Sequence, residues 1–428
     1  MKWKICLLLM VPFFYVSGYA QKDNYILLKP DRVFDGEKMQ TGWVVLIKND
    51  SIAAAGPMNF KLPAGTTIIE LKNKTVLPGL IEGHSHLFLH PYNETSWNDQ
   101  VLQESRAERT ARAVVHAKAT LMAGFTTVRD LGTEGAMYDD AGLKMAIDKG
   151  VIPGPRMIIA TRAIVAKGTY GPKSKNIDTE FLNGAEEVGG IESITTAVRT
   201  QIGKGADCIK VYADYRYGLN DEAVPTFTIE ELQAMVAIAS SSGRKVVAHA
   251  SSAEGMRRAI LAGVSTIEHG DEGTAEVFTL MKEKGVALCP TLAAGDAVAQ
   301  YRGWQKYTVA GGKKAAPEPE RIIQKRKTFR MALDAGVVIS MGGDVGVFAH
   351  GDNAREMEMM VDYGMQPLAV LQAATSVNAV VFGYDKIIGK IQPGLLADII
   401  AVEGDPSTNI KDVRKIKLVI KAGKLVKE

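Results

Sequence analysis

The chain contains the stretch Val76-Leu77-Pro78-Gly79-Leu80-Ile81-Glu82-Gly83-His84-Ser85-His86, in which an apolar run leads directly into two histidines. In a strand, residues i and i+2 point to the same side, so the imidazoles of His84 and His86 would leave one face together and could bind one cation. Two histidines at this spacing also occur by chance. The stretch therefore predicts a metal site only if other metal-binding side chains end neighbouring strands.

Runs rich in β-branched residues alternate with amphipathic helical patterns along most of the chain. The expected strands are 76–81, 126–131, 156–161, 207–212, 245–250, 265–269, 286–291 and 337–342, with helical patterns such as 105–123, 191–203, 228–242 and 317–335 between them. Many of these patterns end in a glycine just before the next strand, as a helix C-cap does. Eight strands in this order predict an α/β fold, a (β/α)8 TIM barrel, with its active site at the C-terminal ends of the strands.

Both ends of the chain carry short β-type runs in place of β-α units. Residues 21–75 and 389–428 share this style, with turn signals such as Asp35-Gly36 between the runs. We therefore expect a small β-sandwich domain formed by both chain ends, packed beside a barrel over residues 76–388. Two separate β appendages are the alternative that the sequence leaves open.

Residues 1–20 have the pattern of a cleaved signal peptide. Lys2 and Lys4 precede the apolar run 5–16, and small residues lie before a cut ahead of Gln21. The apolar run is too short to span a bilayer comfortably. Cleavage removes two lysines and no acidic residue, so the formal net charge falls from +3 to +1. We expect an exported protein, periplasmic or secreted, with no membrane association after cleavage.

Charge and cysteine content narrow the range of partners. A near-neutral mature chain without a basic run gives no support for a nucleic-acid or anionic-membrane partner. Cys6 belongs to the predicted signal peptide, and Cys208 and Cys289 lie in predicted strands, so a disulfide framework is not expected and both thiols are expected to be buried. A small-molecule or dipeptide substrate is the partner that remains, and a homo-oligomer is compatible with the sequence.

Further residues that could bind a metal lie at predicted strand ends, and these are Lys210, His249, His269 and Asp344. Each has an ordinary explanation when taken alone. A histidine that ends an apolar strand can be a satisfied core side chain, and an aspartate after a strand often caps the next segment. Together with the first two histidines, however, they would surround one barrel mouth. The set predicts a metal centre, and imidazoles with carboxylate-type oxygens suit Zn²⁺.

Lys210 is an unusual residue to point into a barrel, because an unpaired ammonium there carries a heavy desolvation penalty. One interpretation is a side chain that snorkels from the strand end or pairs with a carboxylate. The other is a carbamate, formed when the amine takes up carbon dioxide and becomes a carboxylate that can bridge two divalent metal ions. The surrounding histidines favour the carbamate.

The chain resembles the amidohydrolase superfamily of metal-dependent hydrolases. The resemblance covers nearly the whole mature chain and rests on residues 77–86, Gly124-Phe125-Thr126-Thr127-Val128-Arg129-Asp130, Lys210, His249, Ile267-Glu268-His269-Gly270, Gly343-Asp344, Gly389-Lys390-Ile391, Gly394 and Ala397-Asp398-Ile399. Within the superfamily, the chain is similar to the prolidase-like and imidazolonepropionase-like branch, which includes Xaa-Pro dipeptidases.

This resemblance implies a role for each candidate ligand. His84 and His86 would bind the more buried of two divalent ions, and His249 and His269 would bind the more exposed one. Carbamylated Lys210 would bridge the ions. Asp344 would contact the first ion and act as a proton shuttle while a hydroxide shared by both ions attacks an amide.

Two positions separate this chain from other branches of the superfamily. Deaminases place a glutamate three residues after the strand-five histidine, where Ser252 stands here. Imidazolonepropionases lack the bridging lysine, so Lys210 argues against that activity. The resemblance thus implies hydrolysis of an amide in a dipeptide of the Xaa-Pro kind or in an N-acyl amino acid. A lactonase or cyclic-amide hydrolase on the same metals, and a non-catalytic exported binding protein, are the alternatives.

Substrate contacts are the least defined part of the prediction. Tyr212 shares strand parity with Lys210, Tyr170 lies in the loop after the third strand, and His350 follows Asp344 in the last loop. Each is a candidate substrate-binding residue and is equally well explained as an ordinary mouth residue. Many relatives have Gly-Gly-His in the third loop, whereas this chain has Gly168-Thr169-Tyr170.

Overall fold

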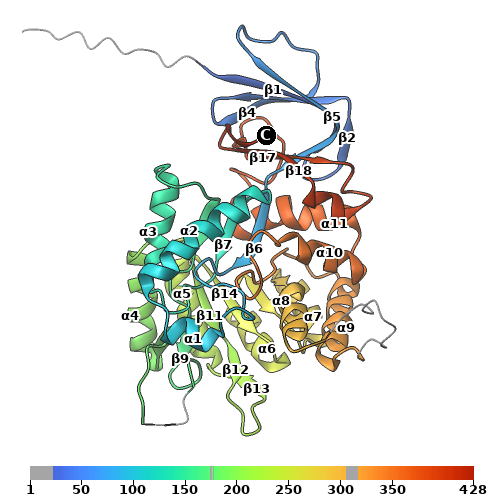
Figure 1. Ribbon diagram of the computed structural model, residues 1–428. Helices are drawn as coiled ribbons and strands as arrows, with labels where there is room; N and C mark the ends of the chain where they lie inside the picture. The colour runs from blue at the N-terminus through green and yellow to red at the C-terminus, as the bar shows by residue number, and fades with distance from the viewer. Residues whose placement is uncertain (1–22, 174–175, 177, 305–316) are drawn as a thin grey trace, which may run out of the picture.

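The computed structural model describes residues 23–173, 176, 178–304 and 317–428. The predicted signal peptide 1–20 lies outside the described residues. Figure 1 shows a barrel of strands and helices with a smaller β-domain at one end. In the described ranges, no helix combines the length and apolarity that a membrane crossing requires.

Parallel strands form the barrel wall in chain order, and these are β6 (Leu80–Ser85), β7 (Phe125–Asp130), β8 (Arg156–Ile159), β11 (Cys208–Tyr212), β14 (Lys245–Ala250), β15 (Thr266–His269) and β16 (Ala287–Cys289). The Asp207 N–H donates to the Ile159 carbonyl over 2.7 Å and joins β8 to the start of β11. At the mouth, β9 (Ile164–Ala166) and β10 (Glu186–Val188) extend the wall beside β11.

Residues 337–345 close the barrel between its last and first strands. On one side, the Leu288 N–H donates to the Val338 carbonyl over 2.9 Å. On the other side, the Gly83 N–H donates to the Met341 carbonyl over 3.0 Å. The predicted (β/α)8 barrel is therefore confirmed.

The segment 337–345, which includes the expected strand 337–342, makes isolated bridges at Ile339 and Val345 and no regular strand. Its glycines explain the departure, because they let the backbone approach both neighbours more closely than a side chain would allow. A Cβ at Gly342 would lie 2.7 Å from the backbone nitrogen of His84 and 2.5 Å from the Cys289 sulfur.

Helices cover the outside of the barrel and the region near its mouth. Their bounds are α1 (Trp97–Leu102), α2 (Arg106–Met122), α3 (Asp139–Asp148), α4 (Gly190–Gly203), α5 (Ile229–Ser240), α6 (Ala253–Ala262), α7 (Ala275–Lys284), α8 (Leu292–Tyr301), α9 (Glu320–Ala335), α10 (Ala354–Asp362), α11 (Pro367–Gln372), the π-helix η1 (Ala373–Val377) and α12 (Asn378–Phe382). Hydroxyl side chains cap α2, α5, α6 and α7, and the left-handed glycines Gly263, Gly285 and Gly336 end α6, α7 and α9 as expected.

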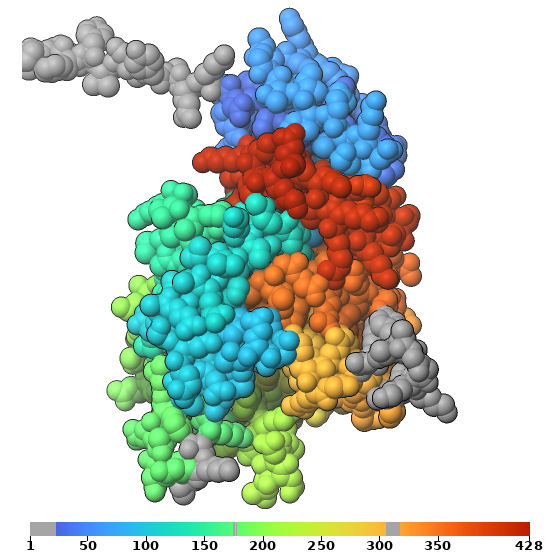
Figure 2. Space-filling view, viewed as in Figure 1, coloured from blue at the N-terminus to red at the C-terminus, as the bar shows by residue number. Residues whose placement is uncertain are grey.

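Both chain ends build the small domain. Its strands are β1 (Tyr25–Phe34), β2 (Met39–Thr41), β3 (Trp43–Lys48), β4 (Ser51–Pro57), β5 (Thr67–Pro78), β17 (Ile399–Glu403), β18 (Ile416–Lys421) and β19 (Lys424–Lys427), with the 3-10 helix η2 (Ile410–Arg414) between β17 and β18. Antiparallel pairing of β5 with β17 joins the two ends into one sheet. The Ile52 N–H also donates to the Leu395 carbonyl over 2.8 Å and adds a second link between the two ends. Figure 2 shows the two ends as adjoining blue and red surfaces.

The predicted strand 76–81 is divided between the two domains. Val76 and Leu77 belong to β5 of the small domain, and the barrel strand β6 begins at Leu80. The break falls at Pro78-Gly79, where proline removes a donor from the ladder. A Cβ at Gly79 would lie 2.0 Å from the Thr126 hydroxyl, so only glycine fits this crossing.

Candidate active site

A cavity of about 330 Å³ opens at the C-terminal ends of the barrel strands, and five predicted ligands line it, namely His84, His86, His249, His269 and Asp344. They come from β6, β14, β15 and the segment that closes the barrel. Lys210 of β11 is buried beside them, with its Nζ 5.6 Å from the centre of the Tyr212 ring. Tyr212 itself lines the cavity.

The first two histidines each bind a protein acceptor through Nδ1 and turn Nε2 toward Asp344. His84 donates from Nδ1 to Glu268 Oε2 over 2.9 Å, and His86 donates to the Gly132 carbonyl over 2.9 Å. Their Nε2 atoms lie 3.6 and 3.3 Å from Asp344 Oδ1. Partners on one nitrogen fix the tautomer and leave the other nitrogen for a metal.

The other two histidines differ from the first pair, and from each other, in which ring nitrogen has a protein neighbour. His269 Nδ1 lies 2.8 Å from the Thr291 hydroxyl oxygen, and His249 Nε2 lies 3.7 Å from Asp214 Oδ1. The centres of the two imidazole rings are 4.5 Å apart. Burial is the main cause that lowers the pKa of His249, to about 3. This imidazole is therefore neutral at pH 7, which is the form that binds metals.

The donor set around Asp344 fits a divalent metal ion. Ligand atoms of His84, His269 and Asp344 all lie within 4.8 Å of one another. Burial by itself would lower the pKa of His86, but the hydrogen bond to Asp344 and the charge of Asp344 raise that pKa to about 9. A cation between these groups would replace that proton. Imidazole nitrogens with a carboxylate oxygen are the donors of catalytic zinc sites.

The environment of Lys210 disfavours its ammonium form. The side chain is 1% exposed, and burial lowers the pKa of its ammonium group despite the negative charges of Glu268 and Asp344. A neutral amine has the free electron pair that reaction with carbon dioxide requires. The chemistry of this position is thus compatible with the carbamate suggested by the sequence.

Several residues at the barrel mouth have left-handed backbone conformations although they are not glycine. The φ angles are 74° at His269, 62° at Asp344, 50° at Thr291 and 48° at Glu134. Such conformations cost free energy and occur mainly where the surrounding structure and the function demand them. Backbone strain of this kind is set by tertiary contacts, and no sequence pattern had indicated it.

A buried ion pair between Glu268 and Arg129 holds the imidazole of His84 in place. Glu268 accepts from Arg129 Nη2 over 2.8 Å, and Arg129 Nε donates to the Gly83 carbonyl over 2.7 Å. Burial alone would raise the pKa of the Glu268 carboxyl. The charge of Arg129 and the hydrogen bond and charge of His84 instead hold that pKa well below its usual range. Both residues belong to motifs that the sequence had marked, but no role had been predicted for either.

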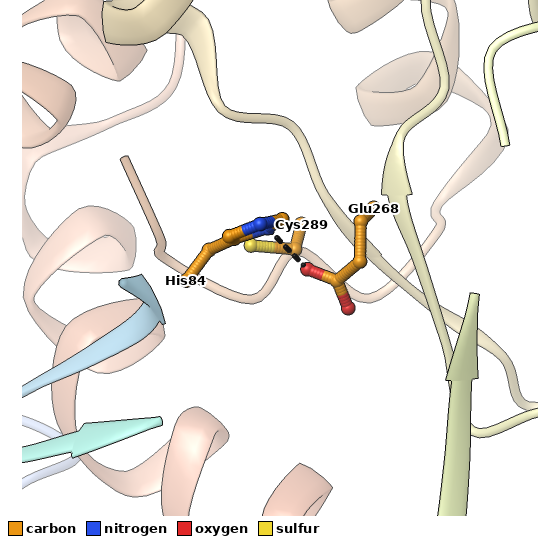
Figure 3. A group of neighbouring side chains, drawn as sticks. All are labelled: His84, Glu268 and Cys289. Atoms are coloured by element: carbon orange, nitrogen blue, oxygen red, sulfur yellow. Dashed lines mark hydrogen bonds and ion pairs between the residues drawn. The ribbon is translucent and has the colours of Figure 1, made fainter. Parts of the chain in front are cut away.

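Cys289 completes the group drawn in Figure 3, where the thiol lies beside the His84–Glu268 hydrogen bond. Its Sγ is 3.7 Å from the Gly342 carbonyl, and burial raises the pKa of the thiol well above its usual value. A protonated thiol is a poor metal ligand. Because His84 Nδ1 already donates to Glu268, this group holds the His84 ring in place.

An aromatic wall flanks the metal ligands. Tyr170 and Tyr212 line the cavity as predicted, and their ring centres are 4.8 Å apart. Trp97, Tyr215 and Glu134 also line it, although the sequence had not marked them. The Glu134 carboxylate accepts from Tyr170 and from Trp97 Nε1, the latter over 3.0 Å.

The structure does not bring His350 to the cavity. Its imidazole stacks on His116 with ring centres 4.3 Å apart, and Nε2 donates to the Leu89 carbonyl over 3.0 Å. His116 in turn donates from Nδ1 to the Leu87 carbonyl over 2.8 Å. The two rings thus hold the backbone that follows the first metal-ligand pair, and the expectation that His350 contacts substrate is corrected.

The chain belongs to the amidohydrolase family, whose sequence model matches residues 75–426. It is 30% identical to ochratoxinase from Aspergillus niger over 376 residues, which cover 82% of this chain and 75% of that protein. The family generally uses divalent metal ions, in agreement with the donor set described above.

Solved structures extend the likeness to the whole fold. A Xaa-Pro dipeptidase with methionine bound in its active site superposes with a TM-score of 0.83 and 31% identity, covering 95% of this chain and 100% of that one. A prolidase complexed with N-methylphosphonate-L-proline gives a TM-score of 0.79 and 26% identity, with the same coverage. The chain is a hydrolase that acts on carbon–nitrogen bonds.

Proposed function

We propose that this chain is a binuclear-metal amidohydrolase that cleaves the amide bond of a dipeptide of the Xaa-Pro kind or of an N-acyl amino acid. The observation that carries the proposal is the convergence of His84, His269 and Asp344 ligand atoms within 4.8 Å at a cavity floor. The amide-cleaving relatives support the substrate class. A cavity of about 330 Å³ lies at the lower end of the range of ligand pockets, about 300–1,000 Å³, and suits a small substrate.

His84 and His86 would hold one ion, and His249 and His269 would hold the other. Two divalent ions, with zinc favoured by the donor set, would supply an activated water and polarise the substrate carbonyl when bound. Lys210 would bridge them after its Nζ forms a bond to the carbon of carbon dioxide and loses a proton to solvent. The resulting carbamate carries one negative charge, as a carboxylate does.

Asp344 would move the proton. Burial alone would raise the pKa of the Asp344 carboxyl, but the imidazoles of His84 and His86 hold that pKa well below the usual range. The group is therefore ionised. Its Oδ1 faces the Nε2 atoms of both first-strand histidines and can accept a proton from the attacking water at that point. The same oxygen can then donate this proton to the leaving nitrogen, which completes the hydrolysis.

A hydrolysis screen of the purified protein tests the proposal. The protein is prepared with Zn²⁺ and bicarbonate and offered dipeptides, N-acyl amino acids, cyclic amides and lactones. We expect release of free amine from dipeptides or N-acyl amino acids, loss of this activity on chelation, and recovery on adding metal. Faster turnover of lactones or cyclic amides would instead assign the site to those substrates. Metal-loaded protein that binds one of these compounds but hydrolyses none of them would instead indicate a binding protein.

We also propose that the chain is exported after removal of residues 1–20. The basic start, the short apolar run and the small residues before Gln21 support this location. Mass spectrometry of protein recovered from the periplasm or medium should find Gln21 as the first residue. Recovery of only the uncleaved chain from the cytoplasm would contradict export.

A further inference from the structure

Glu134 places a carboxylate in the wall of the cavity. It follows β7, its backbone is left-handed with a φ of 48°, and the residue is 2% exposed while lining the cavity. Oε2 accepts from Trp97 Nε1 over 3.0 Å and from the Tyr170 hydroxyl, and the Tyr212 hydroxyl lies 3.4 Å from Oε1. These partners are all neutral, so they fix the position of the carboxylate without neutralising its charge.

The rings around Glu134 make a surface suited to a cation. Tyr170 is at the centre of this cluster, with ring centres 5.2 Å from Trp97, 4.8 Å from Tyr212 and 4.9 Å from Tyr215. Aromatic faces attract cations, and an ammonium group binds best where such faces and a carboxylate meet. The cluster therefore combines both features on one wall of the cavity.

Arg109 is a buried cation whose charge interacts with that of Glu134 but whose guanidinium makes no hydrogen bond to the Glu134 carboxylate. Arg109 donates to three backbone carbonyls, those of Glu134 over 2.6 Å, Thr133 over 3.0 Å and Phe88 over 3.1 Å. Its guanidinium is thus committed to the loop that carries Glu134 and not to the carboxylate. Among the described residues no cationic side chain donates to the carboxylate, so its cavity side can take a charged donor that the substrate brings.

The opposite wall of the cavity has the opposite charge. β7 and β15 are the second and sixth strands around the barrel, so the loops that follow them face each other across the mouth. After β15, Asp271 pairs with Lys325 and, over 3.4 Å, with Arg321. Two cations against one carboxylate leave this side with a net positive charge. A substrate that is positive at one end and negative at the other matches this arrangement.

We propose that Glu134 binds the free α-ammonium group of a dipeptide, so that the site selects substrates with an unblocked amino terminus over their N-acyl analogues. This inference rests on the proposed function and narrows its substrate class. Trp97, Tyr170 and Tyr212 position the carboxylate and supply the aromatic faces. The metal ligands lie between the two charged walls, where the amide of such a substrate would sit.

The test compares alanyl-proline with propionyl-proline, which has the same shape but lacks the ammonium group. The wild-type enzyme should give the higher kcat/KM for alanyl-proline. Glu134→Gln keeps the size and one acceptor oxygen, and should lower kcat/KM for alanyl-proline by about 10- to 100-fold, as expected for a lost charged hydrogen bond. Hydrolysis of propionyl-proline should change by less than about threefold. Glu134→Asp should recover part of the preference.

Since both substrates are measured on the same variant, partial loss of folding or of metal cancels in their ratio. Glu283→Gln, which changes an exposed glutamate of α7 on the outside of the barrel, is the matched control and should leave the ratio unchanged. An equal fall for both substrates in Glu134→Gln would overturn the proposal and leave Glu134 a structural residue. A wild-type enzyme that prefers propionyl-proline would overturn it as well.

Failure of the proposed function is distinguishable from failure of this inference. If the metal-loaded wild-type protein hydrolyses neither compound, both serve as ligands in calorimetric titrations. Tighter binding of alanyl-proline by the wild type, lost in Glu134→Gln, would support the ammonium site without hydrolysis. Equal binding of the two compounds by the wild type would overturn it.

Discussion

His84 donates from Nδ1 to Glu268 Oε2 over 2.9 Å, and neither side chain is more than 1% exposed. The second oxygen of Glu268 accepts from Arg129 over 2.8 Å. Histidines that bind a metal usually donate their other N–H to a carboxylate or carbonyl, which orients the ring and raises its basicity. The pair thus fixes the ring whose Nε2 faces Asp344 at the proposed metal centre.

Replacing Glu268 by glutamine should weaken metal binding and destabilise the protein. We expect metal affinity to fall by about 10- to 100-fold, because the partner that orients His84 loses its charge. The metal-free protein should lose about 3–5 kcal/mol of unfolding free energy, because Arg129 remains buried without its counter-ion. Metal titration and urea unfolding measure the two effects.

Glu254→Gln is the control for this variant, because Glu254 forms exposed ion pairs with Arg257 and Arg258. Such pairs contribute little, about 0–1 kcal/mol, so both quantities should change only slightly. Unchanged metal affinity in Glu268→Gln would show that the carboxylate does not orient the metal-binding ring.

Replacing Lys210 by alanine should remove the bridge between the two ions. The wild-type protein, prepared with bicarbonate and excess metal, is expected to hold about two divalent ions per chain. Lys210→Ala should retain fewer and lose most activity, and a short carboxylic acid should restore part of both by supplying the missing bridge. Elemental analysis and activity measurements check these outcomes.

Lys245→Ala offers a matched control, since Lys245 starts the neighbouring strand β14 and donates to the Val381 carbonyl over 2.7 Å, away from the cavity. It should keep both ions. If Lys210→Ala bound two ions without added acid, or if active wild-type enzyme carried an unmodified amine at Lys210, the carbamate would be ruled out.

The convergence of the candidate metal ligands on one cavity could be predicted from the sequence because the relevant signals are local. Strand periodicity and the position of each histidine at the end of an apolar run are enough to place His84, His249 and His269 at one mouth. The same reasoning gave the barrel and the joint domain of the two chain ends. It placed the start of the first barrel strand too early, because the apolar run continues through Pro78-Gly79 from one domain into the other.

The supporting residues could not be found in this way, because their roles depend on contacts between distant parts of the chain. Glu268 pairs with Arg129 across the barrel, and the sequence around either residue contains no pattern that predicts this ion pair. Glu134 meets Tyr170 only because the loops after β7 and β9 converge. His350 illustrates the opposite error, since its sequence position near Asp344 suggested the cavity while stacking on His116 holds it elsewhere.

Replacing Asp344 by asparagine should separate metal binding from proton transfer. Asparagine keeps the size and one coordinating oxygen but removes the base. Metal content should therefore stay largely intact while kcat falls by about 100-fold or more, within the range for a positioned general base. KM should change little, because the proton moves only on the way to the transition state. Near-normal turnover with both metals bound would assign the proton to another group.

Arg321 is the residue expected to bind a substrate carboxylate. It lines the cavity and its side chain is 56% exposed. Within the described ranges its one ion pair, with Asp271 at 3.4 Å, uses a single N–H group of the guanidinium. Lys325 is less suitable, because it donates to the His269 carbonyl over 2.7 Å and supports a metal ligand. Arg321→Gln should raise KM for alanyl-proline by about tenfold with little change in kcat, since the contact is made equally in the ground and transition states.

The same variant should hydrolyse alanyl-prolinamide, which lacks the carboxylate, as well as the wild type does. Arg326→Gln is the control on the same helix, because Arg326 pairs with Glu318 and lies outside the cavity lining. It should leave both substrates unaffected. Steady-state kinetics with the two substrates decides the matter, since a carboxylate contact predicts a loss confined to alanyl-proline. An equal rise in KM for alanyl-prolinamide would mean that Arg321 shapes the cavity wall and does not recognise the substrate's charge.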